Sequence, residues 1–317
     1  MNLKRKFDAG EFAVLAEMEP PKGVDVSTML SNAMRVKGEV DAFVIPEMSN
    51  AVMRMSSLGG AMILQGKGME TVMQVNCRDR NRIALQADLL AANGCGITNV
   101  MAVAGEDPSF GDHYQARSVY DIDLLELLNA VRGLQDGKDM AGIELSGSPI
   151  DLLELLNAVR GLQDGKDMAG IELSGSPQFL VGSTVDAGAK GKSPELEIEE
   201  MNKKIEAGVQ FFISPPLFDL SAIHPFMKRV DIQKTKIIPT VLLLKSLGMA
   251  RYIMRNVDNV YISDSLIDRI QKSPDKVREC TQIASEMVTS LKKEGFSGVN
   301  LATLGWEHKL PEILERI

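Results

Sequence analysis

Short apolar runs alternate with longer amphipathic stretches along most of the chain. The apolar runs are rich in β-branched and aromatic residues, which is typical of buried strands. The amphipathic stretches repeat apolar residues three and four positions apart, a spacing that places them on one face of a helix. The predicted strands are residues 12–17, 41–46, 71–77, 97–104, 179–184, 209–214, 236–242 and 298–304. The predicted helices are residues 26–38, 51–65, 80–94, 122–134, 195–207, 219–229, 247–294 with breaks, and 308–317.

The regular alternation of strands and helices decides the fold class. A helix between two strands returns the chain to the same end of the sheet, so the strands are expected to be parallel. Eight such units in about 290 residues fit a closed (β/α)8 TIM barrel in the α/β class. An open, doubly wound sheet is the alternative. We therefore expect residues 1–317 to form a single catalytic barrel.

One segment of the chain is a tandem repeat without a single difference. Residues 122–149 recur letter for letter as residues 150–177. Structural repeats diverge because only their packing positions are constrained, so this identity indicates a recent insertion or an artefact, with a working repeat as the alternative. The repeat falls between predicted helix 4 and strand 5, a connection on the barrel face away from the active site. We expect only one copy to pack on the barrel.

Composition and charge exclude several classes of protein. Lys and Arg number 35 against 43 Asp and Glu, a formal net charge of -8, so the basic footprint of a nucleic-acid binder is missing. No apolar run approaches the roughly 18 residues of a membrane-spanning helix, and the first residues lack the apolar core of a secretory signal. The three cysteines and three histidines are far apart in the sequence, so no local metal-binding spacing is present. We expect a cytoplasmic protein without a metal.

Acidic and polar residues follow the predicted strands, at the end of a barrel where catalytic residues gather. They are Glu17, Glu47, Asn76, Glu106, Asp107, Thr184 and Ser214. A carboxylate at an apolar strand end has a raised pKa and can act as a general acid near neutral pH. A surface ion pair or a helix cap is the alternative for each of them. Glu17 is the strongest candidate because the stiff Pro20-Pro21 turn follows it.

Two charged segments invite more specific interpretations. Residues 77–81 (CRDRN) form either an anion-binding corner with two arginines or a helix start whose arginines pair with carboxylates. Residues 188–193 (GAKGKS) follow a strand, but Asp186 stands where a P-loop has its first glycine, so an NTPase is not supported. Ser193-Pro194 still predicts a helix start whose amides could face a cofactor phosphate.

Six motifs, in this order, resemble the methylenetetrahydrofolate reductase family. They are Glu17-x-x-Pro20-Pro21-Lys22, Cys77-Arg78-Asp79-Arg80-Asn81, Gly94-x-Gly96-Ile97-x-Asn99-Val100, Gly105-Glu106-Asp107-Pro108, Val119-Tyr120-Asp121 and Ala207-Gly208-Val209-Gln210-Phe211-Phe212-Ile213. The resemblance covers most of the chain once one repeat is set aside. It implies a (β/α)8 barrel with FAD, or alternatively FMN, that reduces 5,10-methylenetetrahydrofolate to 5-methyltetrahydrofolate. Hydride would pass through the flavin from NAD(P)H or from a partner redox subunit.

The resemblance also implies roles for individual residues. Glu17 matches the general acid that protonates a folate nitrogen. Glu106 matches the acidic residue beside flavin and pterin, with Asp107 as the alternative for that position. Tyr120 matches an aromatic residue that packs on the flavin. The full set assigned to the cofactor is Asn76, Glu106, Asp107, Tyr120, Thr184, Glu197 and Lys204. The set assigned to the substrate is Glu17, Ser214 and Leu247.

Four positions depart from the family's pattern. Gln74 stands where a flavin-contacting His is common, and Ala104 stands where an Arg often precedes Gly-Asp. Pro215 replaces a Gln that touches folate, and Leu247 replaces a Phe near the substrate. These departures indicate a divergent branch that works in an oligomer or a hetero-complex. Two other functions stay open: a non-autonomous folate- or flavin-binding subunit of a redox complex, and a pterin-dependent methyltransferase.

Overall fold

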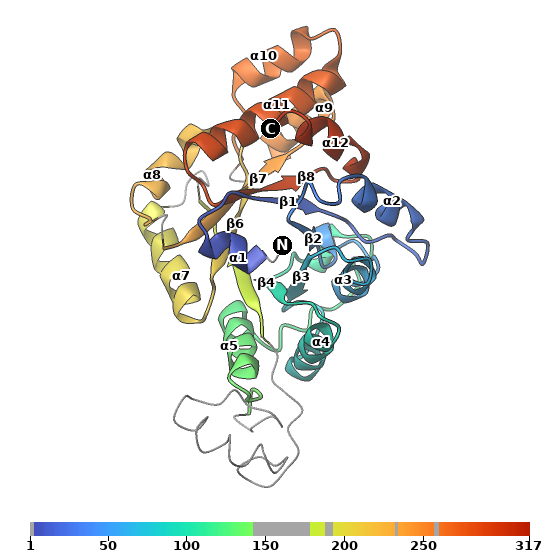
Figure 1. Cartoon of the computed structure of the whole chain (residues 1–317), viewed down its shortest axis with the longest axis vertical. Helices are drawn as coiled ribbons and strands as arrows, with labels where there is room; N and C mark the ends of the chain where they lie inside the picture. The colour runs from blue at the N-terminus through green and yellow to red at the C-terminus, as the bar shows by residue number, and fades with distance from the viewer. Residues whose placement is uncertain (1–2, 142–177, 188–192, 232–233, 257–259) are drawn as a thin grey trace.

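Eight parallel strands form a closed barrel in the computed structural model, in the order in which they occur along the chain (Figure 1). The structure describes residues 3–141, 178–187, 193–231, 234–256 and 260–317. The strands are β1 Ala13–Glu17, β2 Ala42–Ile45, β3 Thr71–Asn76, β4 Asn99–Val103, β5 Leu180–Thr184, β6 Phe211–Pro216, β7 Lys236–Leu242 and β8 Gly298–Ala302. Pairing of Leu15 on β1 with Asn300 on β8 closes the barrel. The predicted (β/α)8 fold is confirmed.

Helices surround the barrel (Figure 1). They are α1 Leu3–Asp8, α2 Ser27–Arg35, α3 Ser57–Gln65, α4 Arg82–Gly94, α5 Leu124–Gln135, α7 Pro194–Glu206, α8 His224–Met227, α9 Leu247–Asn256, α10 Asp264–Lys272, α11 Lys276–Lys293 and α12 Leu310–Leu314. Single 3₁₀ turns are η1 Ser49–Ala51, η2 Pro108–Phe110, η3 Leu220–Ala222 and η4 Glu307–Lys309. The long helical stretch predicted at 247–294 is three helices, because Ser263 and Asp275 cap new helices within it.

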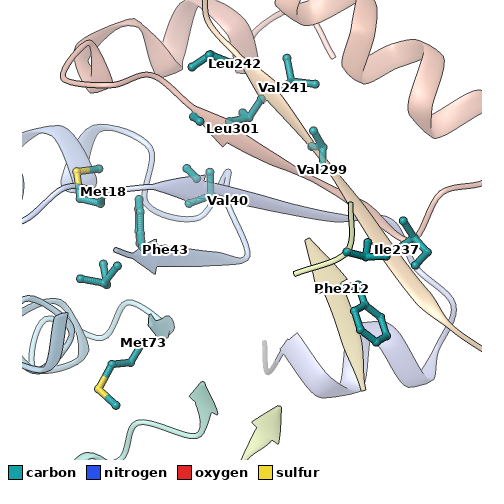
Figure 2. Packing of buried hydrophobic residues seen from close by; sticks show 14 of the residues in the cluster. Met18, Val40, Phe43, Met73, Phe212, Ile237, Val241, Leu242, Val299 and Leu301 are labelled. Carbon is teal, nitrogen blue, oxygen red and sulfur yellow. The ribbon is translucent and has the colours of Figure 1, made fainter. Parts of the chain in front are cut away.

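The alternation of side chains along each strand divides the core into two clusters. The larger cluster fills the space between the strands and the outer helices, and Figure 2 shows part of it, including Phe43, Phe212 and Val299. The smaller cluster lies inside the barrel and consists of Leu3, Phe7, Ala13, Leu15, Ala42, Val44, Val72, Met101, Leu180, Phe211, Ile213 and Ile238. The barrel interior is therefore packed below the strand ends that carry the polar residues.

Helix α1, which the hydrophobic pattern did not predict, closes the amino-terminal end of the barrel. Its Leu3 and Phe7 join the interior cluster, and the rings of Phe7 and Phe211 lie 5.8 Å apart. Gly182 makes room for Phe211, since a Cβ there would lie 2.2 Å from that ring. In the described part of the chain, side chains therefore fill the barrel at its amino-terminal end.

The first copy of the repeat supplies α5, whose buried face includes Leu127, Val131 and Leu134. The second copy, residues 150–177, lies outside the described residues. That only one copy packs on the barrel therefore stays a prediction. Within the described part of the chain, no helix combines the length and the apolar character that crossing a bilayer requires.

Candidate active site

A cavity of about 360 Å³ opens at the carboxyl ends of the strands. Its size suits a small organic ligand. Apolar residues include Val44, Met101, Ile213, Leu242 and Ala302, and polar ones include Glu17, Gln74, Thr184, Ser214, Thr240 and Asn300. A larger groove of about 440 Å³ is lined by α11 residues and Arg316, but it contains no strand-end residue. The cavity at the strand ends is therefore the candidate active site.

Glu17 ends β1 and projects into this cavity. The side-chain amide of Asn300, on the neighbouring strand β8, donates a hydrogen bond to Glu17 Oε1 at 2.8 Å. Burial raises the pKa of Glu17 from 4.5 to about 7, the bond from Asn300 opposes that rise, and the charges of Glu19 and Glu307 add to it. Near neutral pH, Glu17 therefore exists in both protonated and ionised forms, as a general acid requires.

Behind Glu17, two further polar side chains form a chain of hydrogen bonds. Asn300 Nδ2 lies 3.3 Å from Thr240 Oγ1, and the Thr240 hydroxyl donates to the carbonyl oxygen of Ser214 at 2.7 Å. Sequence analysis missed Asn300 and Thr240 because both lie within strands. The sequence feature that marks them is a polar residue inside an otherwise apolar strand, Thr240 in IIPTVLL and Asn300 in GVNLA.

A second layer of charge lies beside Glu17. Glu19 forms an ion pair with Arg54 at 3.0 Å, and burial raises the pKa of the Glu19 carboxyl. Glu307 accepts a hydrogen bond from the backbone of Gly305 at 2.9 Å. The Lys245 ammonium lies 5.7 Å from the centre of the Trp306 ring. The surroundings of Glu17 thus contain both carboxylates and cations.

The segment 77–81 is held by internal ion pairs. Arg78 binds both carboxylate oxygens of Asp79, each at 2.6 Å. Arg80 contacts Glu47 at 2.8 Å and Asp88 at 2.7 Å. The structure therefore favours the interpretation in which the arginines pair with carboxylates over an anion-binding corner. Asn81, and not the acidic residue of the segment, caps α4.

Asn76 lies beneath this segment and is fully buried. Its amide donates to Asp79 Oδ2 at 3.0 Å, and its carbonyl oxygen accepts from the Asp79 backbone at 3.1 Å. Its amide also lies 3.4 Å from the carbonyl oxygen of Glu47. In the described structure Asn76 organises the end of β3.

The predicted cofactor residues Glu106, Asp107 and Tyr120 lie in the segment after β4 and are not among the residues that line the cavity. The Glu106 side chain is 56% exposed, and its carboxylate lies 3.9 Å from Arg78. Asp107 caps η2. The Tyr120 hydroxyl donates to the carbonyl oxygen of Gly105 at 3.3 Å. Gly105 has a φ of +89°, and a Cβ there would lie 2.9 Å from Arg78, so this turn requires glycine.

Thr184, Glu197 and Lys204 are also brought together. Thr184 lines the cavity, and Lys204 on α7 donates to its carbonyl oxygen at 2.7 Å. Glu197, buried on the same helix, accepts from the backbone of Asp186 at 2.7 Å. The predicted helix start is confirmed, since Ser193 caps α7 and Pro194 is its first residue. The preceding residues 188–192 lie outside the described residues.

The predicted substrate residues do not all reach the cavity. Ser214 and Pro215 line it, at a point where the register of β6 and β7 shifts. Gln74 lines it as well and accepts from the Glu47 backbone at 3.3 Å. Leu247 packs instead against the outer core cluster at the start of α9. Among the described residues, no three His, Cys, Asp or Glu side chains are arranged to hold a metal ion.

Comparison with known proteins gives one family and several shared folds. A family model described as methylenetetrahydrofolate reductase matches residues 2–317. An uncharacterized protein from Clostridium thermocellum that binds two copies of 5-methyl-5,6,7,8-tetrahydrofolic acid is 13% identical, with a TM-score of 0.58 over 99% of this chain and 98% of that one. EDTA monooxygenase from Chelativorans sp. BNC1 is 12% identical, with a TM-score of 0.55 over 96% and 92%. Both likenesses show the fold alone. No curated protein sequence matches the chain.

Proposed function

The chain belongs to the methylenetetrahydrofolate reductase family, and we propose that it reduces 5,10-methylenetetrahydrofolate to 5-methyltetrahydrofolate with a flavin. One observation carries the proposal. Glu17, with its pKa raised to about 7, lines a cavity of about 360 Å³ at the end of the barrel where catalysis is expected. The folate bound by the Clostridium thermocellum protein supports the substrate class.

The lining of the cavity is of the kind that binds a heteroaromatic ring. Val44, Met101 and Ile213 offer apolar contact, while Gln74 and Thr184 offer hydrogen bonds to a polar ring edge. A flavin bound here supplies hydride transfer, which no amino-acid side chain provides. We propose FAD, with FMN as the alternative. Thr184, Glu197 and Lys204 are the residues proposed for the nucleotide part.

Glu17 is the proposed proton donor. Opening the five-membered ring of the folate requires a proton on the nitrogen that leaves the methylene carbon. A carboxylic acid with a pKa near the working pH is both populated in its acid form and acidic enough to transfer that proton. Glu106 is proposed beside the cofactor, where its negative charge favours a cationic folate.

A hetero-complex is the second candidate for how the protein works. Val24, Phe110 and Tyr114 are 94%, 80% and 70% exposed on loops after β1 and β4. Asp112 joins these loops, because it pairs with Lys22 and accepts from the backbone of Met53 at 3.0 Å. Exposed apolar side chains on these loops are available for contact with another protein, and we propose a partner electron-transfer subunit as the hydride source in place of NAD(P)H. We propose that the protein works in the cytoplasm.

The test begins with the visible spectrum of the purified protein, alone and after incubation with FAD or FMN. Reduced flavoprotein is then mixed anaerobically with methylenetetrahydrofolate. We expect the flavin to reoxidise as 5-methyltetrahydrofolate forms, with product measured by mass spectrometry. A protein that takes up neither flavin would contradict the proposal. Turnover with NADH or NADPH alone would exclude an obligatory partner subunit. Turnover only with an artificial reductant, such as reduced viologen, would favour a partner subunit as the electron donor.

A further inference from the structure

Thr240 fixes the orientation of its neighbour Asn300. The Thr240 oxygen lies 2.7 Å from the carbonyl oxygen of Ser214, which can only accept, so the Thr240 hydroxyl must donate its one proton there. Thr240 can then only accept from Asn300. The group of Asn300 that lies 3.3 Å away must be its NH₂.

The same NH₂ group reaches Glu17 Oε1 at 2.8 Å. Asn300 is therefore a hydrogen-bond donor to Glu17. If its amide group were flipped, the Asn300 carbonyl oxygen would face the Thr240 oxygen, and both atoms would be acceptors. Among the described residues no donor reaches the buried Asn300 Oδ1. Leaving a buried acceptor unpaired costs free energy, so the orientation is imposed by its surroundings.

This arrangement distinguishes the two oxygens of Glu17. Oε1 is committed to accepting from Asn300, so a proton on Glu17 must sit on Oε2. In the described part of the chain, no side chain or backbone group is hydrogen-bonded to Oε2, and Glu17 lines the cavity. The acid form would thus carry its proton on the oxygen that is free to meet a ligand.

We propose that Thr240 and Asn300 are positioning residues that hold Glu17 as a proton donor with its proton on Oε2. The catalytic meaning of this pair rests on the proposed function, but the pair itself can be tested without substrate or cofactor. The donated hydrogen bond favours the ionised form of Glu17 and so restrains the rise in pKa that burial causes.

Other charges near Glu17 must stay constant in such a test. Glu19 precedes the Pro-Pro turn, and Glu307 lies on η4; both raise the pKa of Glu17. The positive charges of Arg54 and Lys245 lower the pKa of Glu19. Asp186 also lines the cavity. None of these residues is altered in the variants below.

The experiment follows the Glu17 carboxyl carbon by NMR in full-length protein labelled with ¹³C at glutamate, with Glu17→Gln used to assign the signal. Thr240→Val keeps the side-chain shape but removes the hydroxyl, which frees Asn300 to present its carbonyl oxygen to protonated Glu17. We expect the Glu17 titration midpoint to rise by about one pH unit. Asn300→Leu removes the hydrogen bond altogether and should raise the midpoint as well.

Two controls keep the result specific. Thr240→Ser retains the hydroxyl and should titrate at the wild-type midpoint. Thr71→Val makes the same substitution at another buried barrel threonine and should also leave the midpoint unchanged. If Asn300→Leu does not fold, as judged by circular dichroism, the comparison of Thr240→Val with Thr240→Ser still decides.

The inference is overturned if the Glu17 midpoint in Thr240→Val equals that of the wild type, or if Thr71→Val shifts the Glu17 midpoint by the same amount as Thr240→Val. A shifted midpoint in a protein that does not reduce methylenetetrahydrofolate would support the positioning pair and reject the proposed function. In an active protein, the midpoint of the pH–rate profile should move with the NMR midpoint.

Discussion

The two ends of the barrel carry nearly the same polar pair. At the carboxyl end, Asn300 donates to Glu17 at 2.8 Å; at the amino end, Asn99 donates to Glu70 at 3.1 Å. Both asparagines are 1% exposed, and in the described structure both keep a buried carbonyl oxygen without a hydrogen-bond partner. The chemistry of the pair alone therefore does not separate a functional site from a structural one.

The surroundings of the two pairs differ. The carboxylate oxygen of Glu70 that accepts from Asn99 also accepts from the backbone of Leu3 at 2.8 Å, so it anchors α1 across the filled end of the barrel. Glu17 faces a cavity, and burial raises its pKa to about 7. The Asn–Glu pair at the filled amino end of the barrel therefore anchors a helix. The Asn–Glu pair at the carboxyl end exposes a carboxyl group to the cavity. This agrees with the division of (β/α)8 barrels into a stabilising end and a catalytic end.

The largest expected effect is a difference in the rate of folate reduction between variants of Glu17 and Glu70. Glu17→Gln removes the proposed proton donor and should lower folate reduction by about 10²- to 10⁴-fold, the usual contribution of a general acid. Glu70→Gln should leave the rate within a few-fold of the wild type. Product formation under saturating folate measures both. Equal losses in the two variants would break the comparison.

The filled end should dominate stability. Phe7→Ala removes a ring from the barrel interior and should lower the free energy of unfolding by about 3–5 kcal/mol in chemical denaturation. The control is Phe110→Ala, at a ring that is 80% exposed, which should change it by less than about 0.5 kcal/mol. A small effect of Phe7→Ala would mean that α1 contributes little to closing the barrel.

The pH dependence of stability should reveal Glu17. In the unfolded chain Glu17 ionises near pH 4.5, but in the fold it stays neutral until about pH 7. The raised pKa means that the wild type loses stability as pH rises between these values, and the loss is complete above pH 7. Glu17→Gln, which is always neutral, should therefore be more stable than the wild type at pH 8 by about 1–3 kcal/mol, allowing for partial solvent screening, and show no gain at pH 4.5. Denaturation at the two pH values checks this, and a gain of equal size at both would contradict it.

The smallest effect concerns the second asparagine. Asn99→Ala should cost about 1–2 kcal/mol of unfolding free energy, because it removes hydrogen bonds to Glu70 and to the carbonyl oxygen of Thr71. Asn99→Ala should leave the midpoint of the pH–rate profile of folate reduction unchanged. Asn300→Ala should move that midpoint to higher pH. A shift caused by Asn99→Ala would show that the two ends are coupled.

The sequence was informative wherever periodicity or strand ends carried the signal. Eight apolar runs predict the eight strands of the barrel, and Glu17 stands out because it follows such a run and precedes Pro20-Pro21. Helix α1 was missed because six residues show little periodicity, and its stability comes from inserting Leu3 and Phe7 into the barrel.

The partners of the strand-end residues could not be predicted, since they come from distant parts of the chain. Asn300 is 283 positions from Glu17 in sequence, and only closure of the barrel between β1 and β8 brings them together. The prediction that Leu247 contacts the substrate stays a prediction; in the structure Leu247, at the start of α9, is partly buried and packs against the outer core cluster. Side-chain direction at a helix start depends on packing that the pattern of residues does not encode.

The most direct test is the rate at which methylenetetrahydrofolate reoxidises the reduced flavoprotein, measured in a single turnover from pH 5.5 to 9. If Glu17 donates the proton, the wild-type rate falls as pH rises through about 7, the pKa of Glu17, and Glu17→Gln is slow with no such fall. Glu70→Gln should follow the wild type. A wild-type rate that does not change through this range, or a Glu17→Gln variant that keeps the wild-type rate and profile, would contradict the account.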